Sequence, residues 1–273
     1  MQHIKIIFFL ISIALLSTCA NYDEELKKIP EFGSLNKTLE TKKTFAHFPP
    51  ELSWKLLIGA NKQGQGPLVI DAKEPGYFAG VARGLDYALK HDKEALSVEL
   101  IEEIRKQATE SVSKNNQTAF EPEIGGSDVK FDLVLGSNTS KDGLAKLRSS
   151  LIGDPLRIIK LNKDNQEYLY RKAVSRKILY PIMKKILDSY ENSSKSIEDI
   201  VRLIQNLYQL HPFNDGNTRT FIIILLQKEL ARNNHTPVIL YNPKHFAAYS
   251  ITELLKDIRE GQARFKTYLS KSL

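Results

Sequence analysis

Apolar residues recur every three or four positions along much of the chain, which is the period of one helix face. The strongest run covers residues 196–210. Its apolar positions are Ile197, Ile200, Val201, Ile204, Leu207 and Leu210. Ser196 precedes this run and Asp199 follows three residues later, which is an aspartate variant of the capping box. The pattern therefore predicts a helix that begins near residue 196.

The run 221–230 (FIIILLQKEL) is apolar on nearly every side, which is typical of a helix buried within the protein. The ten residues between these two helices, 211–220, are predicted to form a loop whose last residues open the second helix. Similar periodicity predicts four more helices. They cover 75–90, 98–112 with Ser97 as cap, 178–190 with Pro181 in its first turn, and 244–260 with Gly261 at its end.

Two segments break the helical pattern. Residues 113–156 are rich in Asn, Gly and Ser and are predicted to be mostly loop, with a short strand at 129–135. Residues 157–170 are predicted to form a β-hairpin, since apolar and aromatic residues flank a polar turn. The first strand of this hairpin is Ile158, Ile159, Lys160 and Leu161. Together the elements predict an all-α fold, a helical bundle with one small β-hairpin.

The first 74 residues divide into two parts. Lys5, the eleven apolar residues 6–16 and the small residues 17–20 form the pattern of a secretory signal peptide, too short for a standard membrane span. Residues 21–74 are polar and interrupted by prolines, and we expect an N-terminal arm with a short helix near 50–60. The expected organisation is a signal peptide at 1–20, the arm at 21–74 and a single domain at 75–273.

The processing of this leader has three interpretations. Cleavage after Ala20 is favoured, because Thr18 and Ala20 fit the small-x-small rule. Cleavage before Cys19 would leave a lipidated cysteine, as in a bacterial lipoprotein, and an uncleaved leader would be an anchor. We expect the protein to be exported, either secreted or periplasmic, with no membrane contact beyond that lipid or anchor. Cys19 is the only cysteine, so the domain has no disulfide.

The charge of the chain changes this picture little. The 273 residues carry a net charge of +7, and the sequence pI is about 9.2. The basic residues are spread along the helices without a cluster of arginines and aromatic residues. This distribution indicates a solvated surface, so we expect no nucleic-acid partner.

Candidate chemistry is concentrated in the loop 211–220, HPFNDGNTRT. His211 has a side-chain pKa suited to accepting a proton near neutral pH. Asp215 can hold Mg²⁺, which often binds through one or two carboxylates together with substrate phosphates. Gly216 and the helix N-terminus can direct N–H groups at an anion, and Arg219 adds a charged fork for phosphate oxygens. Phe213 is expected to turn inward and anchor the loop.

This loop resembles the signature of the Fic family, which includes the Doc proteins: His-x-Phe-x-Asp/Glu-Gly-Asn-x-Arg. The matching residues are His211, Phe213, Asp215, Gly216, Asn217 and Arg219. The resemblance implies a transferase that moves AMP from ATP to a Ser, Thr or Tyr hydroxyl of a target protein. It further implies that His211 is the catalytic base, that Asp215 binds Mg²⁺, and that a nucleotide lies on Gly216, Asn217, Thr218 and Arg219.

In this family a hairpin upstream of the motif aligns the target segment by strand pairing. The resemblance therefore implies that Ile158, Ile159, Lys160 and Leu161 dock the target; a purely structural edge hairpin is the alternative.

Two positions depart from the family pattern. Ile222 stands where many members have a second arginine, which helps to seat the nucleotide phosphates, and Thr218 replaces the usual Gly or Lys. The transferred group is therefore open: AMP, or another group such as phosphoryl or phosphocholine. A catalytically inactive binding protein on a Fic scaffold is a further alternative. A third alternative, a structural envelope lipoprotein, is indicated by Cys19 alone. Export combined with nucleotide chemistry favours a bacterial secreted effector.

Overall fold

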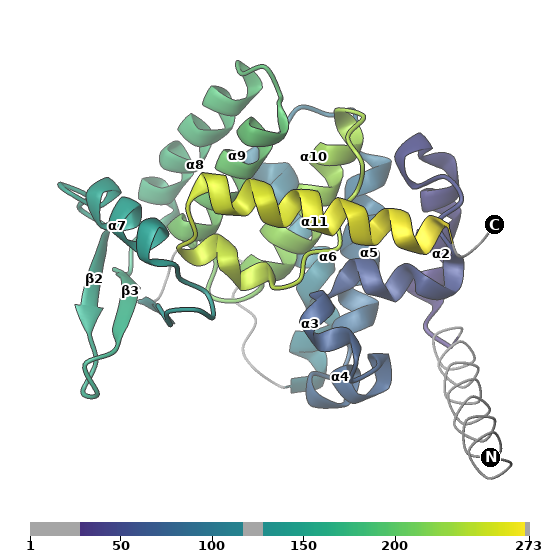
Figure 1. Ribbon diagram of the computed structural model, residues 1–273, viewed down its shortest axis with the longest axis horizontal. Helices are drawn as coiled ribbons and strands as arrows, with labels where there is room; N and C mark the ends of the chain where they lie inside the picture. The colour runs from purple at the N-terminus through teal and green to yellow at the C-terminus, as the bar shows by residue number, and fades with distance from the viewer. Residues whose placement is uncertain (1–27, 117–127, 271–273) are drawn as a thin grey trace, which may run out of the picture.

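The computed structural model describes residues 28–116 and 128–270. The expected signal peptide, residues 1–20, lies outside them, as does Cys19. The described residues form an all-α bundle with a small antiparallel sheet at one side, which confirms the predicted fold class (Figure 1). None of the described helices is long and apolar enough to cross a bilayer.

The helix at the centre of the bundle follows directly on the loop. Its first part is π-helical, η3 (Thr218–Leu225), and its second part is α-helical, α10 (Leu226–Arg232). Its neighbours include α5 (Tyr77–Lys90), α6 (Val98–Asn116) and α9 (Ile197–Leu210). Every apolar side chain of the central helix is buried, which confirms the prediction of a buried helix. Its π-helical turns cannot be predicted from the sequence. The segment is apolar on all sides, so the spacing of its apolar residues does not reveal the number of residues per turn.

Three of the other predicted helices have the expected starts. Helix α9 begins after Ser196, and both hydrogen bonds of the Ser196–Asp199 capping box are present. Helix α5 begins two residues inside the predicted run, after Gly76, and ends with it at Lys90. Helix α6 is capped by Ser97, whose hydroxyl accepts a hydrogen bond from the Leu100 N–H at 3.1 Å. Their amphipathic faces pack into one core, so the period of the sequence identified them correctly.

The last two predicted helices need corrections. In α8 (Arg176–Glu191), Pro181 lies past the first turn. The last segment is not one helix: a short 3₁₀ helix, η4 (Pro243–Ala247), precedes α11 (Ile251–Leu269). Gly261 lies inside α11 and does not end it. A Cβ at Gly261 would collide with the side chain of Val238, so close packing is the reason for this glycine.

The described part of the N-terminal segment has more structure than the expected arm with one short helix. It contains α2 (Pro30–Thr41), η1 (Lys43–Phe45), η2 (Pro50–Leu57), α3 (Ala60–Gln63) and α4 (Pro67–Lys73). The short helix expected near 50–60 is η2, and it is a 3₁₀ helix. Helix α2 packs on α5, where the Phe32 and Phe78 rings lie 6.2 Å apart. The segment therefore contributes to the core.

The sheet contains the predicted hairpin and, beside it, the short strand predicted at 129–135, which ends earlier, at Asp132. The hairpin strands are β2 (Arg157–Leu161) and β3 (Glu167–Arg171), and β1 (Val129–Asp132) pairs with the other side of β3. All pairs are antiparallel and the order is β1-β3-β2, so β2 is an edge strand. Helix α7 (Lys141–Ser150) was not predicted, because its segment is rich in Gly and Ser. Figure 1 shows β2 and β3 projecting from one side of the bundle.

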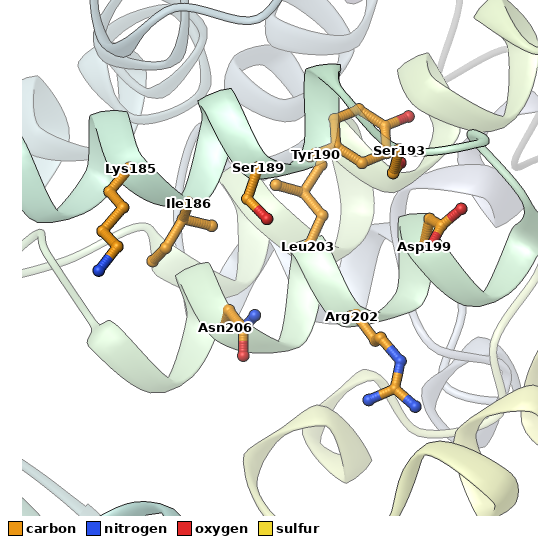
Figure 2. Close-up of a pocket in the computed structure, with 9 residues that line it drawn as sticks. All are labelled: Lys185, Ile186, Ser189, Tyr190, Ser193, Asp199, Arg202, Leu203 and Asn206. Carbon is orange, nitrogen blue, oxygen red and sulfur yellow. The ribbon is translucent and has the colours of Figure 1, made fainter.

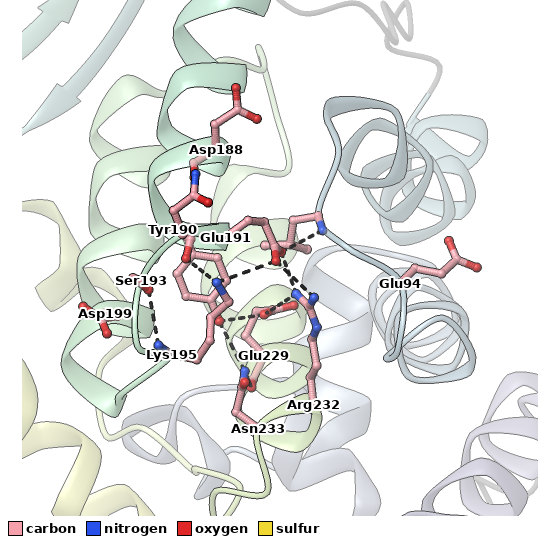
Figure 3. Close-up of polar contacts among 12 residues, drawn as sticks. Glu94, Asp188, Tyr190, Glu191, Ser193, Lys195, Asp199, Glu229, Arg232 and Asn233 are labelled. Atoms are coloured by element: carbon pink, nitrogen blue, oxygen red, sulfur yellow. Dashed lines mark hydrogen bonds and ion pairs between the residues drawn. The ribbon is translucent and has the colours of Figure 1, made fainter.

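A polar network joins the carboxyl ends of α8 and α10 (Figure 3). Glu191 accepts a hydrogen bond from Arg232 at 2.6 Å and another from a backbone N–H of the segment before α6. Glu229 is fully buried; it accepts a hydrogen bond from the Tyr190 hydroxyl at 2.7 Å and pairs with the equally buried Lys228 at 2.9 Å. Because buried charges are costly unless they are paired, this network fixes α10 and, through it, η3.

Candidate active site

His211 occupies a strained position at the carboxyl end of α9. Its backbone angles, φ 49° and ψ 58°, lie in the left-handed region, which is uncommon for a residue with a side chain. Its N–H bonds back to the Leu207 and Tyr208 carbonyls. Its own carbonyl accepts a hydrogen bond from Nε of Arg171 at 2.9 Å. Arg171 is the last residue of β3 and is buried, so the sheet holds the backbone of His211 in place.

The His211 ring lies between aromatic side chains. The Phe131 ring of β1 stacks on it with a centroid distance of 5.3 Å, and the Tyr208 ring lies 5.7 Å away. Burial lowers the pKa of His211 to about 4, and the Tyr208 carbonyl and Asp215 oppose this shift only in part. The imidazole is therefore neutral at pH 7. Its Nδ1 is buried, so Nε2 is the nitrogen that can accept a proton from a bound group.

Phe213 and Asn217 close the loop on itself. The Phe213 ring is fully buried and stacks on Phe221 at 5.7 Å. The Asn217 side chain accepts a hydrogen bond from the Phe213 N–H at 3.2 Å and donates one to the Phe213 carbonyl at 2.7 Å. Asn217 was expected to contact phosphate. Its side-chain amide is engaged inside the loop, and the residue also lines the cavity at this loop.

The middle of the loop lies directly on α6. Gly216 has a φ of 85°, and a Cβ there would come within 2.5 Å of the Thr109 methyl group. Arg105 of α6 donates from Nε to the Asp215 carbonyl at 3.2 Å and lies over the Phe213 ring. Burial lowers the pKa of Arg105 to about 10, so it remains charged at neutral pH. Arg105 and Arg171 thus support the loop from two elements outside it.

Arg219 binds two carboxylates. Its side chain is 6% exposed, its Nη2 pairs with Asp215, and its Nη1 donates to Glu74 at 2.7 Å. Asp215 and Glu74 are considerably more exposed, at 69% and 40%. Thr218 begins η3, and its hydroxyl lies 3.3 Å from the Tyr208 hydroxyl. Sequence reasoning missed Glu74, because a single acidic residue after α4 carries no pattern.

These residues surround a cavity of about 390 Å³, which we call the motif cavity. It is lined by Lys62, Glu74, Tyr77, His211, Asn214, Asp215, Gly216, Asn217, Thr218, Arg219 and Lys244. The structure therefore brings the predicted base, carboxylate and phosphate-binding residues to one place. A cavity of about 330 Å³ between α8 and α9 contains none of the motif residues in its lining (Figure 2).

The hairpin residues do not line the motif cavity. Ile158 and Leu161 on β2 are 52% and 60% exposed, and the Lys160 ammonium lies 3.8 Å from the Tyr170 ring centroid. Within residues 28–116 and 128–270, β2 pairs with β3 alone. An extended peptide therefore has a free strand edge to pair with.

The metal-binding capacity of the site is small. The described residues contain no group of three or more His, Cys, Asp and Glu that could hold a metal ion on its own. Mg²⁺ needs only one or two protein carboxylates when substrate phosphates supply the other ligands. Asp215, which is exposed and lines the motif cavity, fits that role.

Comparison with known proteins identifies the class. The model of the Fic/DOC family matches residues 140–227, from the cap of α7 into α10. Residues 140–227 therefore form a Fic/DOC domain, which confirms the resemblance of the loop. Phosphocholine transferase AnkX of Legionella pneumophila is 28% identical over 139 residues. The match covers 48% of this chain and 14% of that protein, so the chain spans a small part of its relative.

Proposed function

We propose that the protein is a Fic-type transferase that moves a phosphate-containing group from a nucleotide to a hydroxyl of a target protein. The observation that carries this proposal is the neutral His211 at a cavity that also contains Arg219 and Asp215. A base, a phosphate-binding cation and a metal-binding carboxylate meet there. Such transfers rely mainly on positioning and electrostatic stabilisation, so a short constellation suffices.

In the proposed reaction the target hydroxyl gives its proton to Nε2 of His211. Its oxygen forms a bond to a phosphorus atom of the nucleotide, and the bond from that phosphorus to the leaving phosphate breaks. Arg219 and the N–H groups at the start of η3 stabilise the charge on the phosphate oxygens. Asp215 would hold Mg²⁺, which neutralises phosphate charge when it is bound.

Two candidate reactions differ in the nucleotide that donates the transferred group. Transfer of AMP from ATP is our sequence-based proposal, because it is the commonest activity of the family. Transfer of phosphocholine is the second candidate, since the matched relative is named a phosphocholine transferase. The burial of Ile222 supports the second candidate, because the position where many family members have an arginine holds an apolar side chain that is 1% exposed.

The target protein and the place of action belong to the same proposal. We propose that a target segment pairs with the edge of β2 through Ile158 to Leu161, so that its hydroxyl reaches His211. We also propose that the chain is exported and acts as a secreted bacterial effector. A nucleotide-dependent enzyme needs a compartment that contains nucleotide, such as the interior of a host cell.

Calorimetry tests the proposed function. Residues 21–273 are titrated with ATP, CTP, GTP and CDP-choline in the presence of Mg²⁺, beside the variants His211→Ala and Asp215→Ala. We expect one nucleotide to bind tightly, Asp215→Ala to weaken it, and His211→Ala to abolish modification of target protein while the fold survives. If none of the four nucleotides binds, the transferase proposal fails and the alternative of an inactive binding protein on a Fic scaffold replaces it.

A further inference from the structure

The motif cavity borders a second cavity of about 210 Å³, which we call the side chamber. The side chamber is lined by Ile58, Gly59, Asn61, Lys62, Tyr77, Ser137, Thr218, Ile223, Asn242, Pro243 and Lys244. Four of these residues also line the motif cavity: Lys62, Tyr77, Thr218 and Lys244. His211 lines only the motif cavity. The two cavities are therefore adjacent, and we call the place where the shared residues lie the junction.

The side chamber is built from segments far apart in the sequence. The N–H groups of Ala60 and Asn61 donate to the carbonyls of Leu240 and Tyr241 at 2.8 and 3.0 Å. The Asn242 amide donates to the Ser137 carbonyl at 2.6 Å. The first two bonds join the start of α3 to the segment before η4, and the third joins that segment to the loop before α7. Hydrogen bonds between these three segments consequently fix the walls of the chamber.

The charges at the junction are unbalanced. Arg219 is the only cation of the motif cavity that contacts its two carboxylates, Glu74 and Asp215. Lys62 and Lys244 are exposed, and neither ammonium group has a carboxylate partner among the described residues. The three cations Lys62, Lys244 and Arg219 therefore outnumber the two carboxylates, and the lining of the two cavities carries a net charge of +1. A diphosphate complements this arrangement.

The side chamber differs in character from the motif cavity. Tyr77, Ile58 and Ile223 give it apolar walls, and Asn61 supplies an amide. The Tyr77 hydroxyl donates to the Leu57 carbonyl at 2.9 Å, and burial raises its pKa, so it stays neutral. Apolar walls with a few polar groups are typical of sites that bind small organic molecules, and a nucleoside is one.

We propose that Lys62 and Lys244 bind phosphate oxygens of the donor at the junction, and that the side chamber binds its nucleoside. This proposal rests on the proposed function, and it adds a binding site outside the loop 211–220. It places the nucleoside in the chamber and the phosphate groups, the reacting phosphorus among them, between the two lysines, Arg219 and His211.

Two variants test the two halves of the site. Lys62→Gln/Lys244→Gln removes the junction charges, and Asn61→Trp adds bulk at the chamber. The control Lys93→Gln/Lys141→Gln removes the same charge at exposed lysines that line neither cavity. Each protein is titrated by calorimetry with inorganic pyrophosphate and with Mg²⁺ and ATP, CTP, GTP or CDP-choline. Thermal unfolding checks that each variant folds.

The junction variant is expected to bind both the nucleotide and pyrophosphate about tenfold more weakly or worse, because a hydrogen bond to a charged group contributes about that much. Asn61→Trp is expected to weaken the binding of the nucleotide and to leave the affinity for pyrophosphate unchanged. Equal affinities for the junction variant and its control would overturn the lysine site. Equal weakening of both ligands by Asn61→Trp would overturn the chamber assignment. If the unmodified chain binds no nucleotide, the proposed function fails together with this one.

Discussion

Burial of the His211 imidazole sets the pH range in which it can act as a base. Its pKa is lowered from 6.5 to about 4, mainly by burial, with the Arg171 charge adding to the shift. The imidazole is neutral and able to accept a proton above that value. We therefore expect kcat/KM to remain level as the pH falls through 6.5 and to decline with a midpoint near pH 4. A pH profile with a midpoint near 6.5 would show that the ring is exposed to solvent.

The same shift has a consequence for stability. The pKa of His211 in the folded protein lies below its unfolded value, so the unfolded chain binds more protons between pH 6.5 and about 4. The contribution of this group to stability is complete above pH 6.5 and is lost as the pH falls toward 4. In His211→Gln this part of the pH dependence of unfolding should disappear.

Arg171 is the positioning residue that ties the sheet to His211. Arg171→Gln removes the bond to the His211 carbonyl, so we expect kcat to fall about tenfold while the affinity for nucleotide is retained. The matched control is Arg157→Gln, since Arg157 pairs with Arg171 across the strands and bonds to Asp154 instead. Steady-state kinetics separates the two variants. An unchanged kcat in Arg171→Gln would show that other contacts suffice to hold His211.

At the scale of elements, the buried pair Lys228–Glu229 fixes α10. Glu229→Ala would leave Lys228 buried without its carboxylate, which costs about 3–5 kcal/mol of unfolding free energy. Asp188→Ala is the control, because it breaks the exposed Lys184–Asp188 pair and should change stability little. Urea unfolding measures both. Equal losses in the two variants would contradict this role of the pair.

The helices that could be predicted from the sequence are those that bury a single face, because their apolar residues then recur every three or four positions. Helices α5, α6 and α9 each bury one face, and apolar residues recur along them at the helical spacing. Helix α7 lacks such a pattern because Gly143 packs against the backbone of Ala248, a contact that resembles a loop signal in the sequence. The same reasoning failed at Gly261. A glycine selected for close packing cannot be distinguished by sequence from one that ends a helix.

At the scale of the whole molecule, only the part of the candidate site that lies in one short stretch of sequence could be predicted. The loop 211–219 holds the base, the carboxylate and the arginine in one short stretch, so its spacing reveals it. The supporting charges come from Lys62, Glu74, Arg105, Arg171 and Lys244. They come from separate segments of the chain without a shared motif, and only folding brings them together.

The π-helical turns of η3 also limit how the chain can vary. A π-helix accommodates more residues per turn than an α-helix, so the length of η3 sets the rotation between the loop and α10. An exchange of one aliphatic side chain for another inside η3 keeps that rotation. Loss or gain of a single residue turns Arg219 relative to the core. In descendants of this sequence, the segment 218–225 should therefore vary in identity far more readily than in length.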